Sequence, residues 1–474
     1  MTTLYWLRND LRLSDNPALS YAAEQGTVLP VYILDKRISR QMGAASLRWL
    51  HDSLESINKD LQGKLLILAG DPQTLIPDVV HQYDIENVVW NRLYEPETVA
   101  RDSDIKKQLL EQGVQVRSFN ANHLWQPTEI AKKDGTPYKV FTPYYRKGCL
   151  VAGQPRFPLA KPEVLKLLQA DGGLSVSELN LLPAVNWDEK MMSYWHPGEA
   201  GAKELLADFL AGPLFNYKNE RNLPAVRATS RLSPHLHFGE LSPNQVWYAI
   251  VDKCNIEGVA LDSPDVDCYL SELGWREFSA YLLFHFPQMV TQNFNEKFDK
   301  FPWRAAPQHL QAWQKGQTGF PIVDAGMREL WATGYMHNRV RMIVGSFLVK
   351  NLLLDWRQGE AWFWDCLMDA DLASNVASWQ WVAGSGADAA PYFRIFNPVT
   401  QGEKFDPDGD YVKTWCPELG KVPPKLVHKI WEADANLLSA CGVKLGQNYP
   451  NPIVDLKASR QRALDAFADM KEAQ

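Results

Sequence analysis

The chain contains 474 residues, of which 46% are hydrophobic and 22% charged, and its net charge is −7. This length exceeds the usual size of one hydrophobic core, so we expect two domains. The six cysteines form no C-x-x-C pair, which argues against a disulfide framework and against a zinc or iron–sulfur centre. Residues 1–6 do not resemble a signal peptide, and the longest apolar run, residues 343–354, is interrupted by Lys350 and Asn351. We therefore expect a soluble cytoplasmic protein without a membrane segment or a bound metal.

Residues 1–130 alternate short apolar segments with amphipathic ones. The apolar segments predict five strands, at residues 4–7, 28–34, 65–68, 88–90 and 114–116. Helices are predicted between them at residues 17–24, 44–61, 72–83 and 99–112, and Asn16-Pro17 and Asp71-Pro72 supply an N-cap followed by proline. This order predicts an α/β domain with a doubly wound parallel sheet. The sequence has no G-x-G-x-x-G and no phosphate-loop lysine, which disfavours a dinucleotide site of the Rossmann type and a nucleotide triphosphatase.

Residues 131–200 contain seven prolines spread through mixed polar sequence and predict a long interdomain connector. From residue 201 onward the apolar pattern has a helical period. The clearest helices are predicted at residues 202–210, 243–254, 265–286, 307–313, 321–333, 339–354 and 459–474. We therefore expect the second domain, residues 201–474, to be all-helical.

The densest group of polar residues flanks the apolar run at residues 343–354. Its members are Asn338, Arg339 and Arg341 before the run, and Asp369, Asp371 and Asn375 after it. Polar groups beside an apolar core need partners, so these side chains either pair with one another or bind a heteroaromatic ring. A calcium loop is excluded, because Ser374 and Gln380 stand where such a loop needs glycine and glutamate.

Two further motifs allow both a structural and a functional interpretation. The hydroxyls of Thr229, Ser230 and Ser233 precede a predicted helix, where they either cap it or accompany a phosphate held by its free amides, and composition favours capping. Glu272 shares a helix face with Trp275 and Arg276. That group is either an internal salt bridge or a carboxylate and a stacking ring offered to a nucleobase, with arginine for phosphate.

Nucleic-acid binding is compatible with the acidic total charge. Residues 301–400 contain eight Lys or Arg and eight Asp or Glu, so the excess of acid lies outside the polar group described above. Affinity for nucleic acid depends on a local basic face and not on the total charge. The 18 tryptophans also exceed what the core needs, and tryptophan stacks well on flat ligands.

Several motifs, in order along essentially the whole chain, resemble the photolyase/cryptochrome family. They are WLRNDLRLSDN at residues 6–16, TSRLSP at 229–234, WREF at 275–278, MHNR at 336–339, and the segment 379–398 from WQW to DAAPYFRIFNP. The chain most resembles bacterial cyclobutane pyrimidine dimer photolyases of class I or class III. The resemblance implies an α/β antenna domain at residues 1–130, a connector at 131–200 and a helical FAD-binding domain at 201–474.

The resemblance also implies roles for individual residues. The FAD pyrophosphate and ribityl chain are expected at Tyr217, Thr229, Ser230, Leu232 and Ser233, and the isoalloxazine ring at Arg341, Asp369, Asp371 and Asn375. The lesion is expected to contact Glu272, Asn338, Met342, Trp275 and Trp381, and the DNA phosphates Arg221, Arg276, Arg339 and Arg394. The chain that re-reduces flavin is expected at Trp379, Trp356 and Trp303, although each tryptophan alone is also explained by core packing.

The implied activity is that of a deoxyribodipyrimidine photo-lyase, a carbon–carbon lyase that acts on flipped-out pyrimidine dimers in DNA. Excited reduced FAD donates an electron to the dimer, the cyclobutane bonds split, and the electron returns. A second, antenna chromophore is expected. Methenyltetrahydrofolate is the first choice and a deazaflavin the second, because Tyr94-Glu95 is not followed by the Asn-Glu pair of folate-binding relatives. We expect a monomer.

Two other functions of the same family stay open. A cryptochrome would be a blue-light receptor whose output is a partner interaction; Asn375, Met342 and the absence of a long C-terminal extension favour repair. A (6-4) photolyase is disfavoured, because His337-Asn338 stands where that branch usually shows paired histidines. An unrelated flavin oxidoreductase ranks last, since nothing indicates a nicotinamide site.

Overall fold

The computed structural model describes residues 1–472. The chain forms two compact units, described separately below. The first comprises Met1–Phe215, Ser230–Pro287 and Met368–Asp371; the second comprises Asn216–Thr229, Gln288–Leu367 and the remainder from Leu372. The predicted boundaries near residues 130 and 200 both fall within the first unit, so the three-part division of the sequence stays a prediction.

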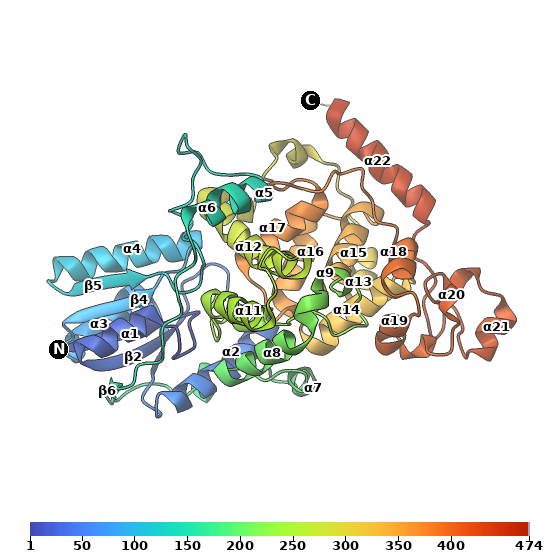
Figure 1. Cartoon of the computed structure of the whole chain (residues 1–474). Helices are drawn as coiled ribbons and strands as arrows, with labels where there is room; N and C mark the ends of the chain where they lie inside the picture. Colours follow the sequence, from blue (N-terminus) through green and yellow to red (C-terminus); the bar gives the residue numbers. More distant parts are fainter. Residues whose placement is uncertain (473–474) are drawn as a thin grey trace. The chain divides into compact units, whose positions relative to one another are not determined.

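The first unit contains a parallel sheet in the order β3-β2-β1-β4-β5 (Figure 1). Its strands are β1 (Thr2–Leu7), β2 (Thr27–Asp35), β3 (Leu66–Gly70), β4 (Asn87–Asn91) and β5 (Gln115–Phe119). All five predicted strands are confirmed. A sixth, β6 (Lys166–Leu167), was not predicted; it comes from the connector and pairs with the start of β2.

Helices cover both faces of this sheet. They are α1 (Pro17–Gln25), α2 (Ala44–Asp60), α3 (Pro72–Gln82) and α4 (Pro96–Glu111). Asn16 and Asp71 cap α1 and α3 as predicted. Alternate residues of β1 point to opposite faces of the sheet. Tyr5 packs in the core with α1 and α2, whereas Trp6 packs in the core with α3 and α4. The sheet is therefore doubly wound, and the predicted fold class of the N-terminal region is confirmed.

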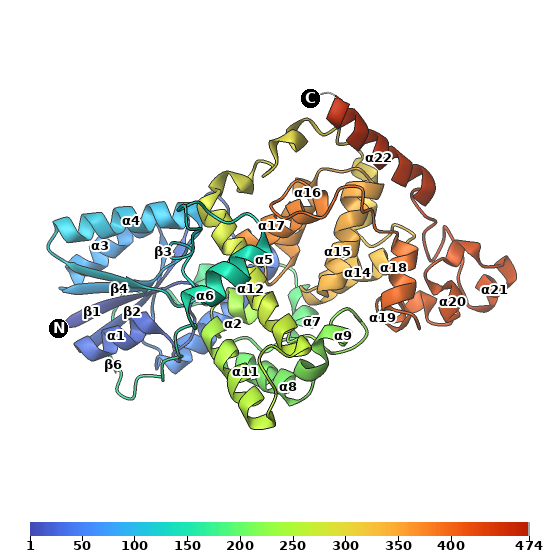
Figure 2. The same ribbon diagram turned by 45° about the horizontal axis from the view of Figure 1, so that its top comes forward.

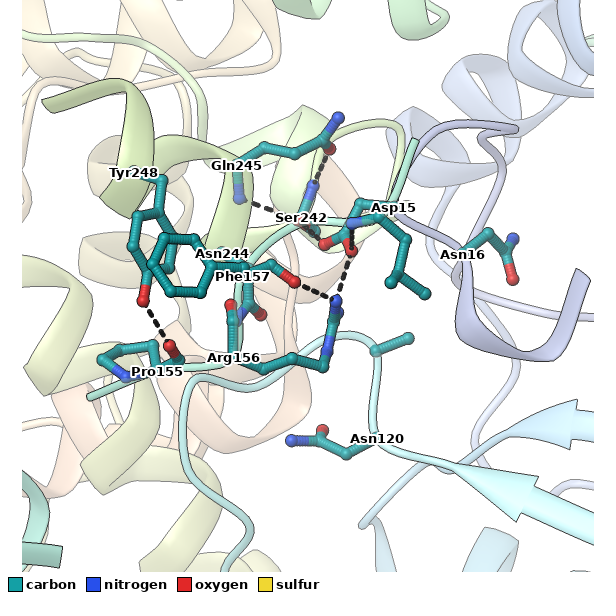
Figure 3. A network of polar contacts seen from close by, with 12 residues as sticks. Asp15, Asn16, Asn120, Pro155, Arg156, Phe157, Ser242, Asn244, Gln245 and Tyr248 are labelled. Carbon is teal, nitrogen blue, oxygen red and sulfur yellow. Dashed lines mark hydrogen bonds and ion pairs between the residues drawn. The ribbon is translucent and has the colours of Figure 1, made fainter. Parts of the chain in front are cut away.

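The connector is more ordered than its prolines suggested. A helical run covers residues 141–152, and the segment after it is fastened by the buried Asp15 (Figure 3). The carboxylate of Asp15 accepts from Arg156 Nη1 at 2.6 Å and from the hydroxyl of Ser242. Tyr248 stacks on Phe157 with ring centroids 4.2 Å apart. The connector segment that follows residue 152 is thus part of the first unit.

Helices supply the rest of the architecture. In the first unit they include α7 (Asp188–Met192), α8 (Glu199–Ala211), α10 (Ser233–His237), α11 (Pro243–Glu257) and α12 (Pro264–His285). In the second they include α9 (Tyr217–Glu220), α13 (Pro307–Gln314), α14 (Pro321–Thr333), α15 (Asn338–Ser346), α16 (Trp356–Cys366), α17 (Leu372–Ala383) and α22 (Leu456–Glu472). Figure 2 shows α15 alongside α14. The all-helical character predicted beyond residue 201 is confirmed.

One predicted helix is wrong in extent. The pattern predicted a single helix over residues 339–354, but α15 ends at Ser346 and a π-helical turn, Phe347–Asn351, follows. The chain then leaves the helical path, with Leu353 at a φ of 58°. Apolar periodicity could not reveal this break, because the residues on both sides of it are buried alike.

The final predicted helix, residues 459–474, is observed as α22, and its last two residues lie outside the described part of the chain. Within residues 1–472, no helix has the length and apolar character that crossing a membrane requires.

Candidate functional site

The predicted site residues are divided between the two units. The first unit contains Ser230, Leu232, Ser233, Glu272, Trp275, Arg276, Asp369 and Asp371. The second contains Tyr217, Arg221, Thr229, Trp303, Asn338, Arg339, Arg341, Met342, Trp356, Asn375, Trp379, Trp381 and Arg394. Each group is described within its own unit.

Helix α12 presents Trp275 as one layer of an aromatic stack. Its ring lies parallel to that of Phe141, with centroids 3.8 Å apart and an interplanar angle of 9°. Tyr145 stacks on Phe141 in turn, and Gly274 lets α12 approach Tyr145, because a Cβ at Gly274 would lie 2.7 Å from the Tyr145 ring. Trp275 itself is half-buried. One of its faces is thus covered and its orientation fixed before any ligand binds.

Arg276 forms its ion pair with Glu277, the next residue in the chain, and not with Glu272, which lies one helical turn earlier. Its Nη1 donates to the main-chain oxygen of Asn122 at 2.7 Å and to Glu277 Oε1 at 3.2 Å. Glu277 is buried and also accepts from the main-chain N–H of Leu124 at 3.0 Å. The structural interpretation of this motif therefore needs a correction: Arg276 pairs with Glu277 and not with Glu272.

The hydroxyl-rich segment before α10 does not cap it. The N-cap position is occupied by Leu232, whose side chain cannot accept a hydrogen bond, and Ser233 is the first helical residue. Ser230 Oγ makes only a long contact, 3.5 Å, with the N–H of Leu232. The prediction that these hydroxyls serve as caps is wrong, because Leu232 occupies the N-cap and Ser233 already lies inside the helix.

The two aspartates of the first unit lie in a partly buried acidic environment. Burial lowers the pKa of His237, Asp371 and Asp369 oppose that decrease, and Arg276 adds to it. Burial, and then the charge of Asp371, raise the pKa of Glu95 to about 7. Asp371 is therefore close enough to His237 of α10, and to Glu95 just before α4, to influence both side chains.

In the second unit, α15 presents three predicted residues on one face. Asn338, Arg341 and Met342 follow the i, i+3, i+4 spacing and are exposed or half-buried, whereas Val340 and Ile343 are buried. His337 is the N-cap, and its Nδ1 accepts from the N–H of Arg339 at 3.2 Å. The helix therefore offers one amide, one cation and one thioether from a single rigid surface.

The arginines at the start of α15 form a cationic cluster. Arg339 donates through Nε and Nη2 to Asn222 Oδ1 at 3.1 and 2.7 Å, and its guanidinium packs over Phe405. Burial, and then the charges of Arg339, Arg341 and Arg221, lower the pKa of His337 to about 4. A neutral imidazole among three guanidinium groups is an environment that favours an anion.

Helix α17 positions Asn375 and Trp379 on one buried face. Asn375 Nδ2 donates to the main-chain oxygen of Glu360 at 3.0 Å and to Glu360 Oε1 at 2.7 Å. Both donor contacts fix the amide, so its carbonyl oxygen keeps its acceptor capacity for another group. Such a fixed, buried acceptor fits the polar edge of a flavin ring.

The three tryptophans of the predicted electron-transfer chain lie in the second unit. Trp379 and Trp356 are buried, and Trp303 is half-buried. A Cβ on Gly359 would lie 2.1 Å from the ring of Trp379, so this glycine lets α16 pack directly against α17. Trp356 is three residues before Gly359 and therefore on the same side of α16. Trp356 Nε1 donates to Asn293 Oδ1 at 3.0 Å, which fixes its ring.

Three residues that support this site were not identified from the sequence. Glu360 fixes the amide of Asn375, Asn222 holds the guanidinium of Arg339, and Phe141 covers Trp275. Of the three, only Asn222 could have been found from the sequence, because it directly follows Arg221, a predicted DNA-contacting residue. The other two are distant in sequence from their partners.

The doubly wound sheet has its switch point between β1 and β4, where folds of this class usually bind ligands. Here the buried Asp10 and Asn91 occupy that crevice. Asp10 Oδ2 accepts from Asn91 Nδ2 at 2.6 Å and from Tyr5 OH at 2.7 Å, and Asn91 Nδ2 also lies 2.8 Å from Asn16 Oδ1. Hydrogen bonds among the chain's own side chains therefore hold Asp10 and Asn91 in place at this edge of the sheet.

Neither a metal site nor a disulfide emerges from the part of the chain that the structure describes. No cluster of three His, Cys, Asp or Glu side chains suited to a metal ion occurs within residues 1–472. All six cysteines there carry free thiols.

The chain is similar to known proteins along most of its length. Residues 3–163 match the family model described as DNA photolyase, and residues 269–469 match the FAD binding domain of DNA photolyase. The chain is 46% identical to the deoxyribodipyrimidine photo-lyase of Agrobacterium fabrum, covering 99% of this chain and 98% of that one. It is 39% identical to cryptochrome-2 of Arabidopsis thaliana, covering all of this chain and 79% of the plant protein.

A solved structure, the bacterial class III photolyase from Agrobacterium tumefaciens, superimposes with a TM-score of 0.95 at 47% identity, covering 99% of this chain and 98% of that one. The similarity in sequence and in fold covers nearly the whole chain, including residues 3–163 and 269–469. The chain is a member of the photolyase/cryptochrome family, with the FAD-binding domain of the DNA photolyases.

Proposed function

We propose that this protein repairs cyclobutane pyrimidine dimers in DNA with the energy of blue light, as a deoxyribodipyrimidine photo-lyase. The observation that carries the proposal is the neutral amide of Asn375, fixed on the inner face of α17 by Glu360. In the family, this position faces flavin N5 and is commonly aspartate in plant cryptochromes. An amide here supports repair over signalling.

FAD is the cofactor of the proposed reaction. When bound, reduced FAD supplies the excited electron that splits the cyclobutane ring. Arg341, Asp369, Asp371 and Asn375 would line its isoalloxazine ring, and Tyr217, Thr229, Ser230, Leu232 and Ser233 its pyrophosphate and ribityl chain. Since Leu232 and not a hydroxyl stands at the N-cap of α10, the first amides of that turn receive no side-chain oxygen there.

The lesion would be held by residues of α12, α15 and α17. Glu272 would hydrogen-bond the dimer bases, where an added electron places negative charge, and such a bond is strongest in a dry site. Trp275 and Trp381 would enclose the dimer. The stack of Phe141 on Trp275 supports this role, because a ring fixed in advance loses little entropy on binding.

The DNA backbone would be bound by arginines and not by the protein's total charge. Of the four, Arg339 is held by Asn222 in the cationic cluster of α15. Arg394 is exposed and Arg276 half-buried. Such contacts fix the register of the duplex without reading its sequence.

Trp379, Trp356 and Trp303 would carry electrons inward when the flavin must be reduced. Trp379 and Trp356 are buried, and Trp303 is the half-buried member of the chain. The close packing of α16 on α17 at Gly359 supports the first step of this route.

A second chromophore would extend the range of light that the protein uses. Methenyltetrahydrofolate is our first choice and a deazaflavin our second. The absorption spectrum of the purified protein, with a near-ultraviolet folate band or a longer-wavelength deazaflavin band, distinguishes them.

A blue-light receptor of the cryptochrome type is the second candidate, favoured by the 39% identity to the plant protein along the whole chain. A defined cyclobutane thymine dimer in a duplex separates the two functions. A photo-lyase restores the thymines under blue light, whereas a receptor without repair activity leaves the lesion intact.

A further inference from the structure

One charged residue in the second unit lies in the apolar stretch after α15 and has no role in the site described above. Lys350 is 1% exposed and belongs to the π-helical turn Phe347–Asn351. Burial places the pKa of its ammonium group well below the usual value. A lone buried cation opposes folding, so stability alone gives no reason for it.

The contacts of Lys350 use its whole ammonium group. Its Nζ donates to the main-chain oxygens of Ala383 at 3.1 Å and Tyr392 at 3.3 Å, and it lies 3.3 Å from the centroid of the Tyr392 ring. Two carbonyls and one ring face match three N–H donors. Among residues 1–472, no charged group contributes to the shift of the Lys350 pKa, and Tyr392 is the titratable group in contact, with its own pKa raised by burial.

The first of these contacts is at the end of α17. Ala383 is the last residue of that helix, where unpaired carbonyls concentrate negative charge. Gln380 holds the same turn from another direction: Oε1 accepts from the N–H of Phe294 at 2.7 Å, and Nε2 donates to the oxygen of Met289 at 2.8 Å. Trp381 lies within this doubly anchored turn.

The second contact is on the segment that follows α17, residues 384–397, which contains Arg394. Its start folds back on the helix: the N–H of Gly386 donates to Gln380 O at 3.0 Å, and that of Ala390 to Trp381 O at 3.3 Å. Lys350 connects Tyr392, further along this segment, to Ala383 at the end of α17, because its ammonium group donates to the main-chain oxygens of both. One buried cation therefore ties together the backbone on both sides of Trp381.

We propose that Lys350 is a positioning residue for lesion recognition, which fixes the last turn of α17 against residues 384–392 and so sets the geometry of Trp381 and Arg394. It touches neither cofactor nor DNA. The inference deepens the proposed function, because it rests on the lesion-binding roles of those two residues.

The first test does not depend on repair. In the FAD-loaded full chain, Lys350→Met keeps the length of the side chain and removes the charge. We expect amide hydrogen exchange in peptides covering residues 382–396 to accelerate roughly fivefold, the equivalent of one helix-terminus charge interaction. Unchanged exchange in this segment would overturn the proposal.

The same turn provides a matched control. Asn351 is equally buried, but its Nδ2 donates to Ser459 Oγ at 3.0 Å, on α22. Asn351→Ala should accelerate exchange in α22 and leave residues 382–396 as in the wild type. If both variants loosen both segments alike, Lys350 contributes only to general packing and the proposal fails.

The second test measures DNA binding by the same FAD-loaded proteins. Lys350→Met should weaken binding to a dimer-containing duplex roughly fivefold and binding to the undamaged duplex by a smaller factor, because Trp381 would meet only the dimer whereas Arg394 would contact phosphate in both. Equal losses on both duplexes would contradict a role in lesion recognition.

These outcomes separate the inference from the proposed function. If the wild type neither binds nor repairs the dimer, the proposed function fails, whatever the exchange data show. If Lys350→Met does not fold, Tyr392→Leu provides the test, because it removes the ring beneath the ammonium but keeps both carbonyls. Tyr392→Leu should accelerate exchange in residues 382–396, Tyr392→Phe should not, and the reverse would overturn the proposal.

Discussion

Asn375 and Glu360 form a paired contact inside the second unit: the amide of Asn375 donates to both the main-chain oxygen and the carboxylate of Glu360, at 3.0 and 2.7 Å. Both residues are buried. The contact fixes which end of the amide is the donor. In the proposed site, the remaining oxygen is the group that meets the flavin.

Asn375→Asp should destabilise the protein, because a second buried carboxylate would face Glu360. We expect a loss of about 1–3 kcal/mol of unfolding free energy at pH 8 and less at pH 5, where the two carboxyls share a proton. Thermal unfolding at both pH values measures this. Adding Glu360→Gln should restore most of the loss, and a loss that is independent of pH and of Glu360 would contradict the account.

Glu272→Ala should lower repair more than binding. Glu272 would stabilise charge that exists on the dimer only after electron transfer, so we expect repair per absorbed photon to fall roughly tenfold, the equivalent of about 1.4 kcal/mol. Affinity for dimer-containing DNA should change far less. Glu272→Gln keeps a hydrogen-bonding group and should recover part of the yield. Unchanged repair per photon in the alanine variant would remove Glu272 from the mechanism.

Arg339→Ala should weaken binding equally for damaged and undamaged duplexes. Because the guanidinium would contact a phosphate, the slope of log affinity against log salt should decrease by about one. Asn222→Ala, which releases the same guanidinium, should give a smaller effect in the same direction. Arg37, 75% exposed on the first unit, provides the control, and Arg37→Ala should leave the slope unchanged. A slope that Arg339→Ala does not alter would exclude the phosphate contact.

Glu95 should make stability depend on pH. Its pKa is raised to about 7 from 4.5, so the folded protein binds more protons than the unfolded chain between these values, and stability falls as pH rises through that window. Glu95→Gln should remove this decline, a difference of at most about 3 kcal/mol from 2.5 pKa units, seen in unfolding scans from pH 4.5 to pH 8. Parallel pH profiles for variant and wild type would contradict the raised pKa.

The sheet could be predicted from the sequence because buried parallel strands are short, continuous apolar segments separated by capped helices. Asn16 and Asp71 marked two of those helix starts correctly. The connector was harder, since strand β6 spans only Lys166 and Leu167 and owes its place to pairing with β2. Pairing of that kind leaves no periodic signal.

The site could be predicted residue by residue only through family resemblance. Physical patterns located the polar groups around residues 343–354 but left open whether they bind a ring or one another. The π-helical turn at Phe347–Asn351 shows the limit, because Lys350 looked like a simple interruption of an apolar run and is in fact a satisfied buried cation. The partner of Asn375, fifteen residues away at Glu360, is likewise set by the packing of α16 on α17.

The central claim, repair of cyclobutane dimers, is tested most directly with a duplex that carries one defined thymine dimer. The FAD-loaded protein, with its flavin reduced, is mixed with this duplex and with a matched duplex carrying a (6-4) lesion, under blue light and in darkness. The account predicts light-dependent restoration of the dimer thymines, no restoration in darkness, and no turnover of the (6-4) lesion. An intact dimer after illumination of the reduced holoprotein would contradict it.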